Sequence, residues 1–184
     1  VGIGIIGRTM NNIYYDSPVW GGFSFTGAYS MNPAAVEADS MSTIRSGRAW
    51  NLQPRFRGSN WAVEWSRWDS KADAGAAADQ KGDRLNAYFT YAGFRVSPSW
   101  DKSRLFTAAT GVETNNRTSW TLPFSYRTGP HTFHLEYTRA KDDDRNLIAD
   151  DGAKLYSLAY VYSLSKRTTM GLTYSKLTNG AGAV

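Results

Sequence analysis

The chain of 184 residues contains no cysteine and only two histidines. Without cysteine there is no disulfide framework and no thiolate chemistry. His131 and His134 lie three residues apart in an expected strand, so their side chains point to opposite faces and do not chelate one metal ion together. The longest apolar stretch, residues 1–7, is far shorter than the ~20 residues of a membrane-spanning helix. The sequence therefore excludes a helical membrane protein.

The sequence is instead rich in segments that alternate apolar and polar residues with a period of two. Each segment has roughly the length that a tilted strand needs to cross a membrane, and none shows a useful amphipathic helical period. A transmembrane barrel has this alternation, which gives its strands the polar composition of a soluble protein. We therefore predict an all-β protein with strands at 8–16, 22–30, 47–57, 60–68, 84–95, 100–110, 117–127, 131–139, 153–163 and 167–177.

The connections between the expected strands alternate strictly between short and long. Short turns rich in Gly, Pro and Ser are expected at 17–21, 58–59, 96–99, 128–130 and 164–166, and long polar loops at 31–46, 69–83, 111–116, 140–152 and from 178 onward. All short turns would lie on one rim and all long loops on the other. This pattern is typical of an antiparallel up-and-down transmembrane β-barrel, whereas a β-sandwich has no reason to sort its loops by length.

The two faces of the expected strands differ in chemistry. Trp50, Leu52 and Phe56 share the face expected to contact lipid, and they alternate with Asn51 and Gln53 on the face expected to line a lumen. Aromatic residues near strand ends are expected in the girdles at the two membrane interfaces. These residues are Tyr15, Trp20, Trp61, Trp68, Tyr126, Tyr137, Tyr162 and Tyr174.

Charges on the lumen face would carry the mechanism of a pore, because charged walls favour solutes of one sign. Basic residues prevail over acidic ones among the residues that strand phase turns inward, which predicts a preference for anions. For any one arginine the alternative is a solvated charge at the rim. The predicted pore-lining residues are Arg8, Asn12, Arg55, Arg57, Glu64, Arg84, Arg127 and Glu136.

Two stretches resemble the general porins of Gram-negative bacteria, especially the β-proteobacterial type. They are residues 8–25 (RTMNNIYYDSPVWGGFSF), a strand, turn and strand, and residues 152–168 (GAKLYSLAYVYSLSKRT), a late hairpin. The resemblance implies a homotrimer of about 16-stranded barrels in the bacterial outer membrane, in contact with membrane lipid and lipopolysaccharide. It also implies passive diffusion of small hydrophilic solutes and anions, without catalysis or cofactor, and an arginine near the constriction that Arg8 matches.

The resemblance also bears on domain organisation. The N-terminal strand of these porins and their closing C-terminal strand, which ends in an aromatic residue, have no counterpart here. Residues 1–184 are therefore expected to be one domain, an internal portion of the barrel with about ten of its strands.

Other functions have weaker support in the sequence. Residues 2–7 (GIGIIG) match the dinucleotide fingerprint, but a strand pattern follows where a phosphate site needs a helix. The carboxylates of Asp142, Asp143 and Asp144 are weak candidates for a Ca²⁺ site, with a solvated acidic loop as the alternative. The arginines alternate along many strands without forming the basic stripe of a nucleic-acid-binding protein. A barrel adhesin or enzyme, and a soluble β-sandwich binding protein, are the remaining alternatives.

Overall fold

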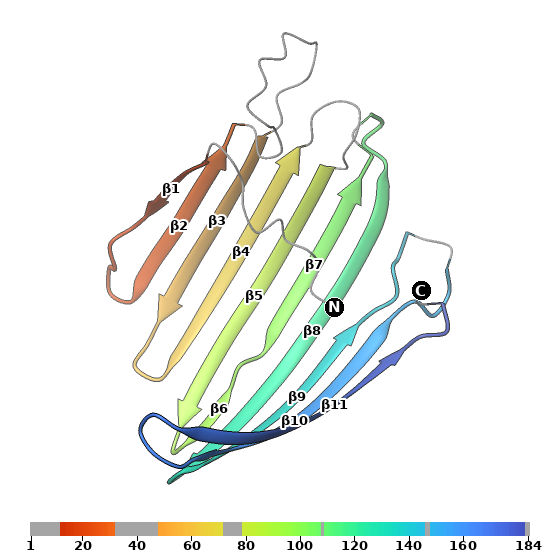
Figure 1. Cartoon of the computed structure of the whole chain (residues 1–184). Helices are drawn as coiled ribbons and strands as arrows, with labels where there is room; N and C mark the ends of the chain where they lie inside the picture. Colours follow the sequence, from red (N-terminus) through yellow and green to blue (C-terminus); the bar gives the residue numbers. More distant parts are fainter. Residues whose placement is uncertain (1–11, 32–47, 72–78, 108, 146–147, 183–184) are drawn as a thin grey trace.

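The computed structural model describes residues 12–31, 48–71, 79–107, 109–145 and 148–182, and these residues form one antiparallel sheet (Figure 1). No helix in this part of the chain is long and apolar enough to cross a membrane. The strands are β1 Asn12–Asp16, β2 Phe23–Ser30, β3 Arg48–Arg57, β4 Trp61–Lys71, β5 Asp79–Tyr91, β6 Phe94–Val96, β7 Ser99–Phe106, β8 Glu113–Thr128, β9 His131–Ala140, β10 Ala153–Ser163 and β11 Thr169–Asn179.

Each strand pairs with its neighbours in the sequence, from β1 at one edge to β11 at the other. The strands β6 and β7 occupy one position in the sheet, because both pair with β5 on one side and with β8 on the other. The sheet is thus a meander, which confirms the predicted up-and-down order and excludes the two packed sheets of a sandwich.

Antiparallel order places successive connections at opposite ends of the sheet (Figure 1). Most connections have the predicted lengths, but the alternation is not strict, because 17–22 and 107–112 both have six residues. We call the two ends the turn end and the loop end. The turn end holds the connections 17–22, 58–60, 92–93, 129–130 and 164–168, and the loop end holds 31–47, 72–78, 107–112 and 141–152.

One predicted turn is wrong. The turn expected at 96–99 lies at Ala92 and Gly93, so the expected strand 84–95 comprises the end of β5 and the start of β6. The strand β5 also begins earlier than expected, at Asp79, within the loop expected at 69–83. Pro98 suggested a turn, but it only interrupts a continuing strand: its carbonyl accepts a hydrogen bond from the Ala87 N–H at 3.0 Å. The proline lacks an N–H group and so divides β6 from β7 without reversing the chain.

The turn between β5 and β6 depends on left-handed backbone at both central residues. The φ angles are 47° at Ala92 and 84° at Gly93, the signature of the type I′ turns that match the twist of hairpin strands. A Cβ atom on Gly93 would collide with the carbonyl oxygen of Arg127 in β8. Gly129, with a φ of 55°, has no atom within 4 Å of the same position.

We expect Gly93→Ala to lower the free energy of unfolding more than Gly129→Ala does. Both substitutions place a side chain in left-handed backbone, at a cost of about 1 kcal/mol. Only Gly93→Ala adds the collision with Arg127, so its total loss should reach about 2–3 kcal/mol. Urea unfolding in phospholipid vesicles, followed by tryptophan fluorescence, measures the difference. Equal losses for the two variants would contradict this assignment.

Candidate pore surface

The outward face of the sheet is apolar. Residues directly opposite each other on neighbouring strands share a face, and Phe56 pairs with Phe23 and Val63 while Phe124 pairs with Leu135. Many of these large side chains are exposed, for example Leu135 at 51% and Leu172 at 76%. The outward face includes Ile13, Tyr15, Tyr29, Trp50, Leu52, Trp61, Trp65, Leu85, Phe89, Trp100, Leu122, Phe133, Tyr156, Leu158 and Tyr174.

Such a face requires an apolar environment. A soluble protein rarely exposes a contiguous apolar patch larger than a few hundred Å². Moving one exposed Leu or Phe side chain out of water is worth roughly 1.5–3 kcal/mol. The only buried hydrophobic residues in the described part of the chain are the small Ala49 and Ala62. The described residues form no second layer over this face, so hydrocarbon is the environment that stabilises it.

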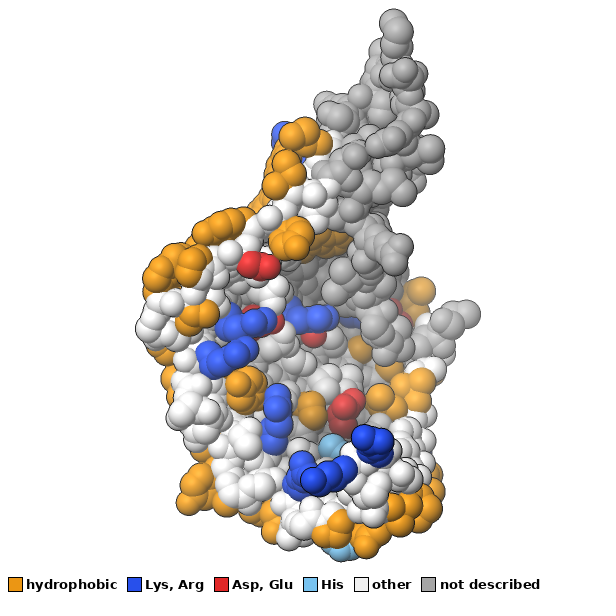
Figure 2. Space-filling model, turned by 60° about the vertical axis from the view of Figure 1, so that its left-hand side comes forward, with side chains coloured by type: hydrophobic (Ala, Val, Ile, Leu, Met, Phe, Trp, Pro, Cys, Tyr) orange, Lys and Arg blue, Asp and Glu red, His pale blue; other side chains and the backbone are white. Residues whose placement is uncertain are grey.

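The opposite face is hollowed and polar, and Figure 2 shows Lys and Arg side chains gathered in the hollow. Seven of the eight predicted pore-lining residues lie on this inner face, because the strand registers place all of them on the side of the sheet opposite to the apolar residues. Arg8 lies outside the described residues, and the pore-lining role of the others stays a prediction. The residues on the inner face are Asn12, Arg55, Arg57, Glu64, Arg84, Arg127 and Glu136.

Two of these arginines are neutralised by ion pairs across the strands. Arg55 Nε donates to Glu64 Oε2 at 2.6 Å, and the amide of Asn86 lies 3.4 Å from the other carboxylate oxygen. Arg84 forms an ion pair with Asp101 of β7. A paired charge contributes little to the potential in the lumen, so these arginines have a smaller effect on a passing ion than an arginine without a partner.

Three other arginines of the inner face form no ion pair within the described part of the chain: Arg57, Arg95 and Arg127. Arg95 donates to Ser97 Oγ at 3.0 Å, and its guanidinium lies 4.5 Å from the centre of the Tyr88 ring. Neither contact removes the positive charge. All three lie at or near the turn end of their strands, where one inner-face carboxylate, Asp16, lies at the end of β1. The inner face is therefore basic at this end.

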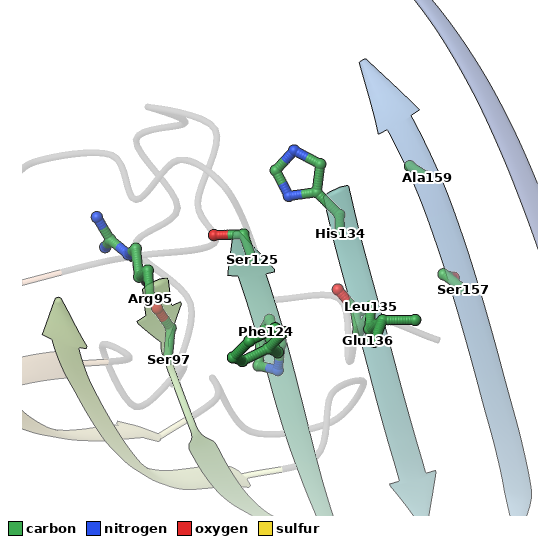
Figure 3. A pocket seen from close by; sticks show the side chains of 10 residues that line it. Arg95, Ser97, Phe124, Ser125, His134, Leu135, Glu136, Ser157 and Ala159 are labelled. Carbon is green, nitrogen blue, oxygen red and sulfur yellow. Dashed lines mark hydrogen bonds between the residues drawn. The ribbon is translucent and has the colours of Figure 1, made fainter. Parts of the chain in front are cut away.

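A shallow hollow beside Arg95 extends over β6, β8, β9 and β10 (Figure 3). Ser97, Ser125 and His134 line it together with Glu136, which accepts a hydrogen bond from the Thr138 hydroxyl at 3.3 Å. These small polar groups offer donors and acceptors to water and to hydrophilic solutes. Within the described residues no three groups of His, Cys, Asp or Glu are placed to hold a metal ion.

Three residues of the inner face were not among the predicted pore-lining residues, and a fourth was predicted on the wrong face. Arg95 was overlooked because the expected strand 84–95 ran through the turn at Ala92 and Gly93, which gave Arg95 the outward phase, and Asp101 and Arg117 depend on partners in other strands. Trp68 was expected in an outward aromatic girdle. This is wrong, because Trp68 pairs with Asn51 and Gly82 and shares the inner face with Glu64.

The acidic residues of the 141–152 loop stabilise the loop itself. Asp143 is 5% exposed, and its carboxylate accepts hydrogen bonds from the backbone N–H groups of Asn116 and Arg145, both at 2.9 Å. The N–H of Asp143 in turn donates to Asp151 at 2.8 Å, and Asp151 forms an ion pair with Arg117 of β8. These carboxylates therefore bind the loop to the end of the sheet.

The remaining two metal candidates serve the same loop. Asp142 accepts a hydrogen bond from the N–H of Gly152 at 2.8 Å. The N–H of Asp144 donates to the Asn116 carbonyl at 3.1 Å, while its own side chain is on the exposed side of the loop. The contacts of this acidic cluster are structural.

An antiparallel sheet with an apolar outward face and a charged, hollowed inner face is the wall of a transmembrane β-barrel. The family model described as Gram-negative porin matches residues 1–182. The chain therefore belongs to the Gram-negative porin family, and this family places it in the bacterial outer membrane. Comparison with curated proteins gives no match.

One solved structure supports the fold assignment. The chain is similar to the anion-selective porin from Comamonas acidovorans, with a TM-score of 0.76 and 23% sequence identity, over 92% of this chain and 49% of that porin. At this identity the likeness shows the fold alone. The chain spans about half the length of the porin it matches.

Proposed function

We propose that the chain forms about ten strands of the wall of a 16-stranded barrel with a water-filled lumen. Small hydrophilic solutes and ions would cross this lumen by passive diffusion. The observation that carries the proposal is the opposition of the two faces, with Leu135 and Phe124 outward and Glu136 and Ser125 inward on the same two strands. A barrel of about 16 strands is wide enough for an aqueous channel, whereas the interior of about eight strands is filled by side chains.

Unpaired arginines support an anion preference for this channel. Arg57, Arg95 and Arg127 present positive charge on the inner face, while Glu64 and Asp101 are each paired with an arginine. A guanidinium stays charged at all physiological pH values, so the preference would not depend on titration of these groups. The name of the Comamonas porin describes the same selectivity for that protein. Arg8 remains a candidate pore-lining arginine on the basis of the sequence alone.

The family and the fold point to a channel rather than an enzyme. His131 and His134 lie on opposite faces, as predicted, and His131 Nδ1 lies 2.8 Å from the Tyr160 hydroxyl on the outward side. Ser125, His134 and Glu136 line one hollow of the inner face, but within the described residues the His134 ring forms no hydrogen bond to a serine or a carboxylate, which a nucleophilic site requires. The 141–152 loop is held against β8 by the hydrogen bond from the Asn116 N–H to Asp143, which does not favour this loop as the ligand-binding loop of an adhesin.

Liposome swelling tests the diffusion channel. Liposomes that contain the complete protein should swell in small neutral sugars, and the rate should fall as the sugar becomes larger. Lumen size limits diffusion in this way, whereas a specific binding site would select one sugar regardless of size. Swelling no faster than that of protein-free liposomes would contradict the channel.

We also propose that the complete protein is a homotrimer whose outward wall contacts outer-membrane lipid and lipopolysaccharide. The porin family supports the trimer, and the exposed aromatic side chains of β2, β4 and β8 support the lipid contact. Native mass spectrometry from a mild detergent should give the mass of three chains. A monomer under conditions that preserve the β-sheet circular dichroism signal would contradict the trimer.

A further inference from the structure

Charged residues on the outward face are confined to its loop-end half. In the turn-end half, the outward residues of the described strands include no Lys, Arg, Asp or Glu. In the loop-end half, four basic residues lie together on β4, β5 and β7, and we call them the outer basic belt: Arg67, Lys81, Lys102 and Arg104. Further outward basic residues flank the belt at the same end, and they are Arg48, Lys71, Arg139, Lys154 and Lys176.

The register places the belt directly above an apolar row. Arg67, Asp83 and Lys102 follow one another across the three strands. Two residues nearer the turn end, the corresponding row is Trp65, Leu85 and Trp100. Because these rows are adjacent on one face, a molecule lying on the wall meets hydrocarbon-binding and anion-binding side chains in succession.

The carboxylates within the belt lie deeper than its cations. Asp83 lies 3.3 Å from both Arg67 and Arg104, and its side chain is 13% exposed against 35% and 26% for the two arginines. Asp69 lies 3.7 Å from Lys81, with 15% exposure against 34%. The acids therefore orient the cations from beneath, and the cations form the accessible surface.

The belt retains unused capacity for an anion. Lys102 forms no ion pair in the described part of the chain, and the Nε of Arg104 is buried without an acceptor there. The outward carboxylates of β4, β5 and β7 are Asp69, Asp79 and Asp83, so the four cations of the belt exceed them and leave an excess of positive charge.

We propose that the outer basic belt binds the phosphate groups of a phosphorylated lipid in the leaflet at the loop end, with the acyl chains on Trp65, Leu85 and Trp100. This proposal rests on the proposed function, because it requires the outward face to contact a membrane. A second copy of the chain is a poorer occupant, because an apolar protein surface would leave Lys102 without an anionic partner. The alternative is that these basic side chains only extend from the membrane into water. In that case outward basic residues would be expected at both ends of the strands, whereas those of the described strands lie only at the loop end.

Native mass spectrometry of the complete, delipidated protein tests the belt, with diphosphorylated lipid A as the probe and its monophosphorylated form for comparison. The wild type should bind the diphosphorylated form more tightly. The double variant Lys102→Gln/Arg104→Gln should lose roughly 30-fold in affinity, at about 1 kcal/mol for each cation. The matched control Lys166→Gln/Arg167→Gln removes the same charge from a turn at the other end and should bind as the wild type does.

Three results would overturn the proposal. One is unchanged affinity in the belt variant, and another is equal affinity of the wild type for both forms of lipid A. The third is dissociation of the oligomer by the belt variant, which would make the belt a contact between copies. The variant's single-channel conductance should equal that of the wild type, so failure of the pore and failure of the belt are distinguishable. If the variant does not fold, the wild-type protein alone still tests the proposal. Its preference for the diphosphorylated form must weaken as the salt concentration rises, and a preference independent of salt would contradict binding by the belt.

Discussion

Charge reversal at Arg95 or Arg127 is expected to shift the selectivity of the pore from anions toward cations. Both arginines lie on the inner face near the turn end, and neither forms an ion pair in the described part of the chain. Reversal of one charge within the ~8 Å screening distance of a passing ion changes the anion-to-cation permeability ratio by roughly 3-fold at low salt. The double variant Arg95→Glu/Arg127→Glu should change it by roughly 10-fold if the sites are independent. Reversal potentials in a salt gradient measure the ratio.

The control for this experiment is Arg139→Glu, which reverses the same charge on the outward face of β9. Its reversal potential should stay at the wild-type value, because the wall separates the charge from the lumen. Arg8→Glu in the same assay tests the hypothesis from sequence that Arg8 contributes more than any other arginine. If Arg95→Glu, Arg127→Glu and Arg139→Glu had equal effects, inner-face charge would not determine selectivity.

Removal of the Asp143 carboxylate is expected to release the 141–152 loop from the sheet. Asp143→Ala leaves the N–H groups of Asn116 and Arg145 and the side-chain amide of Asn115 without their acceptor. Each unsatisfied buried donor costs about 1–3 kcal/mol. The free energy of opening the loop should therefore fall by at least about 2 kcal/mol. Trypsin should then cleave after Lys141 or Arg145 at least about 30-fold faster, in proportion to the open population.

Asp144→Ala is the matched control, because this neighbouring side chain is exposed and only its backbone N–H binds the sheet. Its cleavage rate should remain at the wild-type value. The cleavage rate of Asp143→Asn should lie between those of Asp143→Ala and Asp144→Ala, since the amide oxygen of the new side chain still accepts hydrogen bonds from both backbone N–H groups. Equal protection of the loop in Asp143→Ala would show that the buried carboxylate does not hold it.

Local alternation allowed most of the fold to be predicted from sequence. In β3, Trp50, Leu52 and Phe56 alternate with polar residues, and a strand of period two with one apolar face has a single register that places that face in lipid. Loop lengths added the direction of the strands, because Gly and Pro turns such as Gly129 and Pro130 fall at every second connection. These signals are local in sequence, and the structure confirms the meander they predicted.

Features that depend on neighbouring strands could not be predicted in this way. Pro98 has the local appearance of a turn residue, and only its pairing with β5 shows that the strand continues. The phase of Trp68 in its strand indicates the inner face that it shares with Glu64, but its large apolar ring led to the wrong prediction of a place in the outward aromatic girdle. The neutralisation of Arg84 by Asp101, and of Arg117 by Asp151, requires the register between strands. Sequence analysis therefore found inward arginines without finding which of them keep an unpaired charge.

Planar-bilayer recording of the complete wild-type protein in a potassium chloride gradient is the most direct test of the account. The inner face described above predicts stepwise, water-filled conductance and a reversal potential displaced toward that of chloride, because Arg57, Arg95 and Arg127 outnumber the unpaired carboxylates at the turn end. A reversal potential displaced toward that of potassium would contradict the assignment of these arginines. Absence of conductance from protein that is folded and inserted would contradict the channel itself.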